Sequence, residues 1–295
     1  MGYSVVIPSY KRVELLQRAL ASVYAQSLVP SSVHLVIDEP EDFDKYAFLN
    51  KHDDSLRVTF TGGGFGGAKA RNVGLDQVDA DFVFFLDDDD EWLPEKAEKQ
   101  IELLESRLDA VGVTCQYWKG NDAGKELIAR SEDLVNRCVK IWNYSGGFSC
   151  FGMRWSGELK ELRLRDELAS AQDYEFYLRV AQFGRIAVLN EPQVMYLVHS
   201  GVRISGNRLK KRKSYFQILE FNRELFSFRE YYFNLAKIEL RSAPYSESVG
   251  QVLYRHCKGT VLLFLAIKEP SLSASLWATS FKGIILRVKR GRASA

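Results

Sequence analysis

The stretch FVFFLDDDDEWLP, residues 82–94, joins an apolar run of strand length to four consecutive aspartates. A strand that ends in carboxylates places a polar site at its carboxyl end. Four adjacent ionised carboxylates repel one another, so a folded protein keeps them charged only beside water, cationic side chains or a metal ion. Mg²⁺ and Mn²⁺ take oxygen ligands of this kind and usually share them with phosphate oxygens. One interpretation of the stretch is therefore a metal site that also takes phosphate.

The alternative is an acidic turn that starts a helix. Residues 95–107 have helical periodicity, Pro94 suits a first helical position, and carboxylates stabilise helix N-termini. In this interpretation Asp90 belongs to the start of that helix. A helix cap needs one carboxylate rather than four, so both interpretations stay open on these residues alone.

Outward from this stretch, strands and helices alternate along the chain. The expected strands are residues 4–7, 33–37, 57–61, 82–86, 111–118, 186–189 and 194–198. Helices are expected after the first strand, from Lys69, from Pro94 and from Asp173. The pattern predicts an open, mixed but mostly parallel α/β sheet flanked by helices, with the ligand along the edge where the strands end. Residues 142–153, rich in Gly, Ser and aromatics, are expected to border that edge.

Length and composition describe a folded chain with two electrostatically different parts. The 295 residues are 46% hydrophobic and 26% charged, which is typical of globular proteins and not of disordered ones. Residues 203–295 hold 18 Lys and Arg against 6 Glu and no Asp, a net charge of +12, whereas residues 1–202 carry −10. We therefore predict an α/β domain over 1–202 and a basic, aromatic, mainly helical extension over 203–295.

Neither a disulfide framework nor a membrane span is expected. The cysteines, Cys115, Cys138, Cys150 and Cys257, are far apart and form no CxxC pair. The N-terminal apolar run is too short for a signal peptide, and the longest later run, residues 261–267, is far below the roughly 20 residues that a spanning helix needs. These observations predict a cytoplasmic protein with reduced thiols.

The glycine run at residues 62–67 admits two interpretations. It formally matches the dinucleotide-binding pattern GxGxxG, after a strand and before a helix, with Asp87 about 20 residues further on. That pattern normally follows the first strand of its unit, and Asp87 stands in a run of four acids. Alternatively, the loop approaches a ligand closely, and Arg71 offers a planar cation to phosphate or carboxylate. The alternative role for Arg71 is that of a solvated charge on the helix.

Taken together, five segments resemble family 2 glycosyltransferases with the GT-A fold. The segments are SVVIPSYKR, LVIDE, GGAKARNVGL, FVFFLDDDDEWLPEK and AQDYEFYLRVAQFG, in the order and at the separations typical of that family. They extend from Ser4 to about Gly184. This resemblance implies that residues 1–202 form a GT-A catalytic domain, and it implies both a site and a reaction.

The resemblance implies where the nucleotide lies. Pro8, Ser9 and Tyr10 would surround the base, and Asp38 or Glu39 would help to recognise it. The usual Asp-Asp-Gly-Ser pattern is replaced here by Asp-Glu-Pro-Glu at residues 38–41, which leaves the identity of the base open.

The family's Asp-x-Asp motif corresponds to residues 87–89. Asp87 and Asp88 would face the donor ribose and metal-bound water, Asp89 would bind the metal, and Asp90 would be structural. Arg71 would lie near the donor phosphates or the Asp-x-Asp loop.

Two further residues match family positions in the second half of the segment. Asp173 matches the catalytic base, in a motif that is usually Glu-Asp and is Gln172-Asp173 here. A helix cap is the alternative role for Asp173, and the two roles are compatible. His199 falls where some members have a further metal or diphosphate ligand; a polar residue at a strand end is the alternative.

The resemblance also implies the reaction and its partners. We expect a Mn²⁺- or Mg²⁺-dependent inverting hexosyltransferase that moves sugar from a nucleotide-sugar donor, a UDP-sugar, to a hydroxyl of a glycan or lipid-linked glycan in surface polysaccharide or lipopolysaccharide synthesis. The alternatives are a non-catalytic nucleotide- or glycan-binding module on the same fold and, more distantly, a dinucleotide-dependent oxidoreductase.

The basic C-terminal part suggests a surface partner. Lys, Arg and aromatic residues are interleaved there, but no nucleic-acid-binding motif is present, so a nucleic-acid partner is not expected. An amphipathic helical extension that lays a cationic face on the anionic inner surface of the cytoplasmic membrane fits this composition, because each nearby Lys or Arg contributes about 1 kcal/mol.

Overall fold

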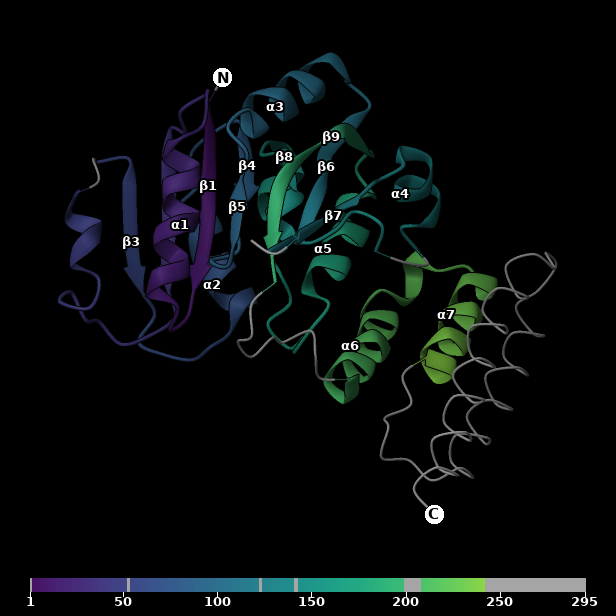
Figure 1. Ribbon diagram of the computed structural model, residues 1–295. Helices are drawn as coiled ribbons and strands as arrows, with labels where there is room; N and C mark the ends of the chain where they lie inside the picture. The colour runs from purple at the N-terminus through teal and green to yellow at the C-terminus, as the bar shows by residue number, and fades with distance from the viewer. Residues whose placement is uncertain (1, 52–53, 122–123, 141–142, 199–207, 242–295) are drawn as a thin grey trace. The chain divides into compact units, whose positions relative to one another are not determined.

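The computed structural model describes the chain except residues 1, 52–53, 122–123, 141–142, 199–207 and 242–295 (Figure 1). The chain divides into two compact units. The first comprises Met1–Glu167 and Gln172–Gly201, and the second comprises Leu168–Ala171 and Val202–Ala295. The predicted boundary after residue 202 falls at residues 199–207, outside the described residues.

The first unit is built of strands and helices in alternation. Its strands are β1 (Tyr3–Ser9), β2 (Ser32–Ile37), β3 (Leu56–Phe60), β4 (Phe82–Phe85), β5 (Asp90–Trp92), β6 (Ala110–Asn121), β7 (Gly124–Ile128), β8 (Gly152–Arg154) and β9 (Arg185–Leu197). Its α-helices are α1 (Val13–Tyr24), α2 (Gly67–Leu75), α3 (Lys96–Ser106), α4 (Glu132–Cys138) and α5 (Gln172–Val180). Three 3₁₀ turns are η1 (Ala47–Lys51), η2 (Phe148–Cys150) and η3 (Gly157–Glu161).

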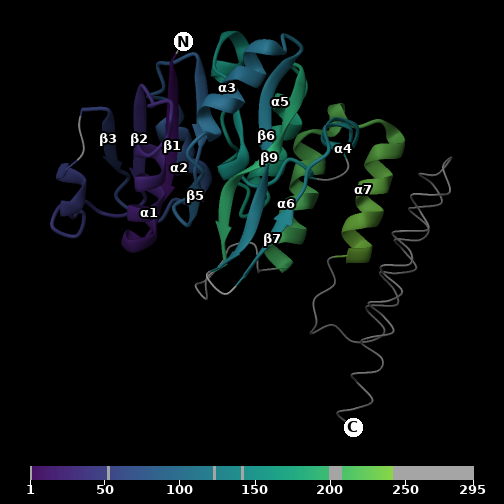
Figure 2. The same ribbon diagram turned by 45° about the horizontal axis from the view of Figure 1, so that its top comes forward.

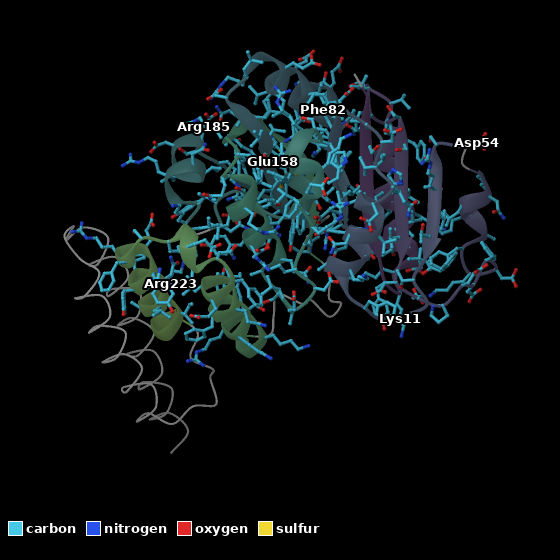
Figure 3. All side chains as sticks on the ribbon, turned by 180° about the vertical axis from the view of Figure 1, so that it is seen from behind. Lys11, Asp54, Phe82, Glu158, Arg185 and Arg223 are labelled. Atoms are coloured by element: carbon cyan, nitrogen blue, oxygen red, sulfur yellow. The ribbon has the colours of Figure 1, made fainter. Side chains whose placement is uncertain are left out.

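These strands form one sheet in which the described residues contribute nine strands, in the order β3-β2-β1-β4-β8-β6-β9-β5, with β7 paired to β6. β3, β2, β1 and β4 are parallel neighbours. β8 is antiparallel to both β4 and β6, and β6 and β9 are parallel again. The predicted α/β fold class is confirmed. Figure 3 shows Lys11 just beyond the carboxyl end of β1, at the opposite end of the sheet from Phe82, which begins β4.

Apolar cores lie on both faces of the sheet, which the helices cover (Figures 1 and 2). Successive side chains of a strand point to opposite faces. Val5 and Ile7 of β1 accordingly pack with Leu16 of α1, whereas Val6 packs with Ala68 of α2. With both faces buried, strands such as β4 are apolar throughout, which explains the continuous run FVFF.

The acidic stretch continues into a strand and not into a helix, so the expectation that Asp90 starts the helix is wrong. Asp90 pairs with Tyr196 of β9 and Trp92 pairs with Val194, which makes β5 an antiparallel edge strand. Trp92 is buried and its Nε1–H donates to the main-chain oxygen of Ser149, at 2.9 Å. α3 begins only at Lys96.

One further segment is assigned only by the structure, and another differs from expectation. The polar segment after residue 119, which has no clear sequence pattern, forms the end of β6, β7 and α4. Residues 186–189 and 194–198, expected as two strands, belong for the most part to one long strand, β9, whose register against β6 shifts near Pro192.

The described part of the second unit is helical. α6 (Arg208–Phe221) and α7 (Phe228–Arg241) are joined by the 3₁₀ turn η5 (Arg223–Leu225), and Ile218 and Ala236 are among their buried side chains. Among the described residues of the whole chain, none of the helices combines the length and apolar character required to cross a membrane.

Candidate active site

The carboxyl end of β2 carries two buried carboxylates that fasten loops. Asp38 Oδ1 accepts hydrogen bonds from Thr61 Oγ1, at 2.6 Å, and from the main-chain N–H of Phe65, at 3.1 Å. Its Oδ2 accepts from the N–H of Gly66, at 2.6 Å. Asp38 therefore holds the glycine run at residues 62–67 against the end of the sheet.

Glu39 fastens the segment that follows β2 to the residues that follow β1. Its carboxylate accepts hydrogen bonds from Tyr46 Oη and Lys45 Nζ, both at 2.6 Å, and from the main-chain N–H of Lys11, at 2.7 Å. Lys11 has a left-handed backbone conformation, with φ of 56°. The end of β1 and the segment that comes after β2 are thus tied to one carboxylate.

Asp88 is hydrogen-bonded to the residues at the end of β1. Ser9 Oγ and the main-chain N–H of Tyr10 donate to its Oδ2, at 2.9 and 3.2 Å. Arg12 Nη1 lies 3.0 Å from Asp88 Oδ1 and 2.8 Å from Asp89 Oδ2, so one guanidinium joins two of the four aspartates. Burial raises the pKa of Asp88 to about 6, although the charge of Arg12 opposes the shift.

Arg71 is ion-paired with the first aspartate. Its Nη2 donates to Asp87 Oδ1, and its guanidinium lies over the ring of Phe148, 4.3 Å from the ring centre. Only 7% of the surface of Arg71 is exposed, so the alternative that Arg71 is a solvated helix charge is wrong. A Cβ at Gly67 would stand 2.8 Å from Arg71 Nη1, so glycine at the start of α2 leaves room for the guanidinium.

Three of the aspartates form a cluster that suits a cation. Ligand oxygens of Asp87, Asp89 and Asp90 lie within 4.8 Å of one another. Asp90 is buried, and burial together with the charges of Asp87 and Asp89 holds its pKa well above the ordinary value. Ser149 Oγ donates to Asp90 Oδ2 at 2.6 Å, while Asp90 Oδ1 is a buried atom without a hydrogen-bond partner among the described residues. Carboxylate oxygens converging in this way fit a hard divalent cation.

Ser149 connects this cluster to the segment that precedes β8. Besides donating to Asp90, its hydroxyl accepts the main-chain N–H of Asp87, at 3.1 Å. η2 thereby fixes the backbone of the acidic turn. The sequence indicated that residues 142–153 border the site, but it did not single out Ser149.

Asp173 lies in the first turn of α5. Its Oδ2 accepts a hydrogen bond from Asn143 Nδ2, and its Oδ1 accepts from the main-chain N–H of Tyr174, both at 2.8 Å. Asn143 is itself oriented, because its Oδ1 accepts the N–H of Ser145 and its Nδ2 also donates to the carbonyl of Gly146. The carboxylate is therefore held in one orientation.

The pKa of the Tyr177 hydroxyl is raised by Asp173 and by Asp87 of the acidic cluster. Tyr177 lies one helical turn beyond Asp173 and is buried, with its hydroxyl unpaired among the described residues. Burial and the negative charge of Asp173 raise its pKa, and Asp87 adds to the shift. Asp173 and the acidic cluster consequently act on one buried group.

The structure thus brings most of the predicted site residues to one edge of the sheet. Residues 8–10 lie at the end of β1, residues 38 and 39 come directly after β2, residues 87–89 lie between β4 and β5, and Arg71 and Asp173 stand on α2 and α5. Their roles toward a substrate stay predictions. His199 lies outside the described residues. Sequence reasoning did not identify Arg12, Asn143 or Ser149, although Arg12 ends the quoted segment SVVIPSYKR.

Comparisons with known proteins are consistent with this geometry. The model of the family described as glycosyl transferase family 2 matches residues 4–157. The chain belongs to this family. Family membership favours the glycosyltransferase interpretation of residues 62–67 over the dinucleotide-binding one, and these residues come after β3 and not after the first strand.

Two relatives and one solved structure illustrate the similarity. The succinoglycan biosynthesis protein ExoW of Rhizobium meliloti is 48% identical over 130 residues, which are 41% of this chain and 38% of that protein. The Escherichia coli protein WfgD, a UDP-Glc:α-D-GlcNAc-diphosphoundecaprenol β-1,3-glucosyltransferase, is 22% identical over 73% of this chain and 84% of its own length. The mannosyltransferase PcManGT from Pyrobaculum calidifontis, solved with GDP-Man and Mn²⁺, shares the fold with a TM-score of 0.60 at 15% identity, covering 99% of this chain and 83% of that one.

Proposed function

We propose that this family 2 glycosyltransferase is a metal-dependent, inverting hexosyltransferase that moves a sugar from a UDP-sugar to a hydroxyl of a glycan or lipid-linked glycan in bacterial surface polysaccharide synthesis. The observation that carries the proposal is the meeting of the acidic cluster and a second, separately held carboxylate, Asp173, at one sheet edge. The activity of WfgD and the pathway of ExoW support the choice of donor, acceptor class and setting.

The donor diphosphate and its metal belong at the acidic turn. Asp89, with Asp87 and Asp90, would hold Mn²⁺ or Mg²⁺, which when bound supplies Lewis acidity toward the departing diphosphate. Arg71, with its guanidinium already directed at Asp87, adds a fixed positive charge beside the same oxygens. Asp88, held by the end of β1, links the acidic turn to the predicted nucleoside site.

Asp173 is the proposed general base. It takes the proton of the acceptor hydroxyl as that oxygen attacks the anomeric carbon, and the bond to the leaving diphosphate breaks in the same step. A single displacement of this kind inverts the configuration. Two features favour an ionised, oriented carboxylate: the hydrogen bond from Asn143 and the position of Asp173 at the N-terminus of α5, where the helix dipole stabilises negative charge.

We also propose that the basic C-terminal part contacts the inner face of the cytoplasmic membrane. Lys210, Lys211 and Lys213 of α6 support this, since all three are exposed. Full-length protein should sediment with vesicles that contain anionic lipid at low salt and be released at high salt. Equal recovery with neutral and anionic vesicles would contradict membrane contact.

A nucleotide-sugar screen by thermal shift tests the proposed function. UDP-, GDP-, ADP- and CMP-sugars are each added with Mn²⁺ or with a chelator. We expect a UDP-sugar to raise the melting temperature with Mn²⁺ and to have little effect with the chelator, because a ligand stabilises the state that it binds. Hydrolysis or transfer of the same sugar then separates an enzyme from a non-catalytic binding module. Stabilisation that is indifferent to the chelator would refute the metal site.

A further inference from the structure

Helix α2 carries, directly after Arg71, an asparagine whose side chain binds a distant part of the main chain. Asn72 Oδ1 accepts the main-chain N–H of Leu164, at 2.7 Å, and Asn72 Nδ2 donates to the carbonyl of Leu164, at 2.8 Å. Nδ2 also donates to Asp166 Oδ1, at 3.0 Å. Asn72 is buried. Among short polar side chains only asparagine combines a carbonyl acceptor with two N–H donors, which these three hydrogen bonds require.

The segment held in this way, residues 163–166, is also bound to α5. Glu175 of α5 is fully buried, and its Oε1 accepts hydrogen bonds from Arg165 Nε, at 2.9 Å, and from Arg179 Nε, at 2.8 Å. Arg179 Nη2 donates in turn to the carbonyl of Arg163, at 2.6 Å. Hydrogen bonds between two charged groups are stronger than those between neutral groups. Residues 163–166 therefore connect α2 firmly to α5.

The opposite side of the site is held by the same helix α2. Arg71 pairs with Asp87 of the acidic turn, whereas Asn72, the next residue, faces the segment that leads to α5. Successive residues of a helix point in directions about 100° apart, so one helix can serve both sides. α2 lies close against the sheet, because a Cβ at Gly74 would stand 2.6 Å from a methyl carbon of Val6. α2 is thus a fixed reference for both sides.

We propose that Asn72 is a positioning residue for the glycosyl transfer, which fixes the place of Asp173 relative to the acidic cluster. It acts through residues 163–166 and through Glu175, which stands two residues after Asp173. The proposal rests on the proposed function, because it assumes that Asp173 is the base. The attacking oxygen must lie between the base and the donor, and a misplacement of about 1 Å can cost about 10²-fold in rate. Asn143 orients the carboxylate locally, whereas Asn72 places the helix that carries it.

The test is the replacement of Asn72 by Ala. The reaction measured is the release of UDP from UDP-hexoses with Mn²⁺, in which water stands in for the acceptor hydroxyl. We expect kcat to fall at least about tenfold and the donor KM to stay within about twofold, because Arg71 keeps its contacts with Asp87 and Phe148. Added to Asp173→Asn, the same replacement should change the residual rate by less than about twofold, because no base is left to place.

A second variant keeps the test independent of how well the first one folds. Arg165→Ala removes one of the two arginines on Glu175 and leaves Arg179 in place. The side chain of Arg165 is 35% exposed, so its removal should change the melting temperature little. We expect kcat to fall several-fold at an unchanged donor KM.

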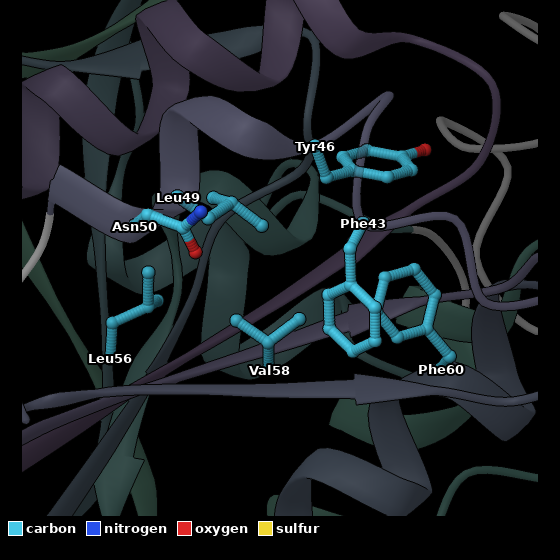
Figure 4. Close-up of a pocket in the computed structure, with 7 residues that line it drawn as sticks. All are labelled: Phe43, Tyr46, Leu49, Asn50, Leu56, Val58 and Phe60. Carbon is cyan, nitrogen blue, oxygen red and sulfur yellow. The ribbon is translucent and has the colours of Figure 1, made fainter.

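Two controls separate positioning from stability. Asn136 of α4 makes a matching pair of hydrogen bonds with the main-chain N–H and carbonyl of Ile186 in β9, at 2.9 and 2.8 Å. Leu49 lines an apolar pocket beside β3 (Figure 4). Asn136→Ala and Leu49→Ala should both lower the melting temperature and leave kcat unchanged, because these contacts lie in parts of the chain that hold neither the base nor the donor.

The outcomes separate this proposal from the proposed function. If the unaltered protein releases no UDP, or if Asp173→Asn releases it nearly as fast, the proposed function is wrong and the positioning role with it. If Asp173→Asn is inactive but Asn72→Ala and Arg165→Ala keep full kcat, only the positioning role is refuted. An equal loss of kcat in Asn72→Ala and Asn136→Ala would also refute it, because the rate would then follow stability alone.

Discussion

Replacing Asp173 by Asn tests the proposed base and has a second consequence that arises from its neighbours. The amide is nearly isosteric with the carboxylate but cannot accept the proton of the acceptor hydroxyl. General base catalysis contributes roughly 10²–10⁴-fold to a rate. We therefore expect Asp173→Asn to lose at least about 10²-fold in the rate of transfer. Donor binding should be unchanged, because the proposed donor residues lie at the ends of β1 and β2, on α2 and on the acidic turn, and not on α5.

The second consequence is a loss of stability. Asn143 donates to Asp173 Oδ2 and the N–H of Tyr174 donates to Oδ1, so both oxygens of the carboxylate serve as acceptors. An amide has one oxygen, and its NH₂ must face a donor whichever way it turns. Asn143 cannot adapt by turning over, because its Oδ1 accepts the N–H of Ser145. An unmatched donor costs about 1–3 kcal/mol when it is fully buried. Both hydrogen bonds here are partly buried, so we expect a cost near the lower end of that range and a melting temperature lower by a few degrees.

A paired exchange separates the two consequences. In Asp173→Asn with Asn143→Asp, the new carboxylate at position 143 accepts from the new amide, so stability should return in part. The return is incomplete because the hydrogen bond from Asn143 Nδ2 to the carbonyl of Gly146 is lost. Transfer should not return, because the carboxylate is displaced from its place on α5. The assays are single-turnover transfer from a labelled donor, donor affinity by calorimetry and thermal unfolding. If Asp173→Asn keeps more than about a tenth of the rate of the unaltered protein, Asp173 is not the base.

Charge is the basis of two further predictions. Arg12→Gln removes the guanidinium shared by Asp88 and Asp89 and leaves the acidic turn more negative. Mn²⁺ should therefore bind several-fold tighter when its affinity is measured without nucleotide. Unchanged or weaker Mn²⁺ binding would contradict the electrostatic role of Arg12. Burial, with the charge of Arg57, lowers the pKa of His34 from 6.5 to about 4. As the pH falls, His34 is therefore protonated in the unfolded chain at a higher pH than in the folded chain. The folded state should lose up to about 3 kcal/mol of stability between pH 6.5 and pH 4. The free energy of unfolding of His34→Gln should fall less steeply over that range, and identical pH profiles for the two proteins would refute the prediction.

Local sequence patterns determined the fold class and the general location of the site. The apolar run before the four aspartates, the alternation of strands with helices and the polar residues at strand ends depend on neighbours within a few positions. They sufficed to predict parallel strands, to place residues 8–10, 38, 39 and 87–89 at one edge, and to mark Arg71 as a candidate. Asp173 became a candidate only through the resemblance to family 2 glycosyltransferases. Local patterns also located the glycine loop, but they could not choose between its two interpretations.

Only the tertiary structure decided which partners each of the four aspartates contacts. Asp88 turns toward Ser9 and Arg12, whereas Asp87, Asp89 and Asp90 converge, and Asp90 enters a strand paired with residues more than 100 positions later. Asn143 and Ser149 likewise act on carboxylates 30 and 59 positions away. Strand register and the directions of side chains in a turn are set by such distant partners. Identical neighbouring residues therefore acquire different surroundings, which the local sequence does not encode.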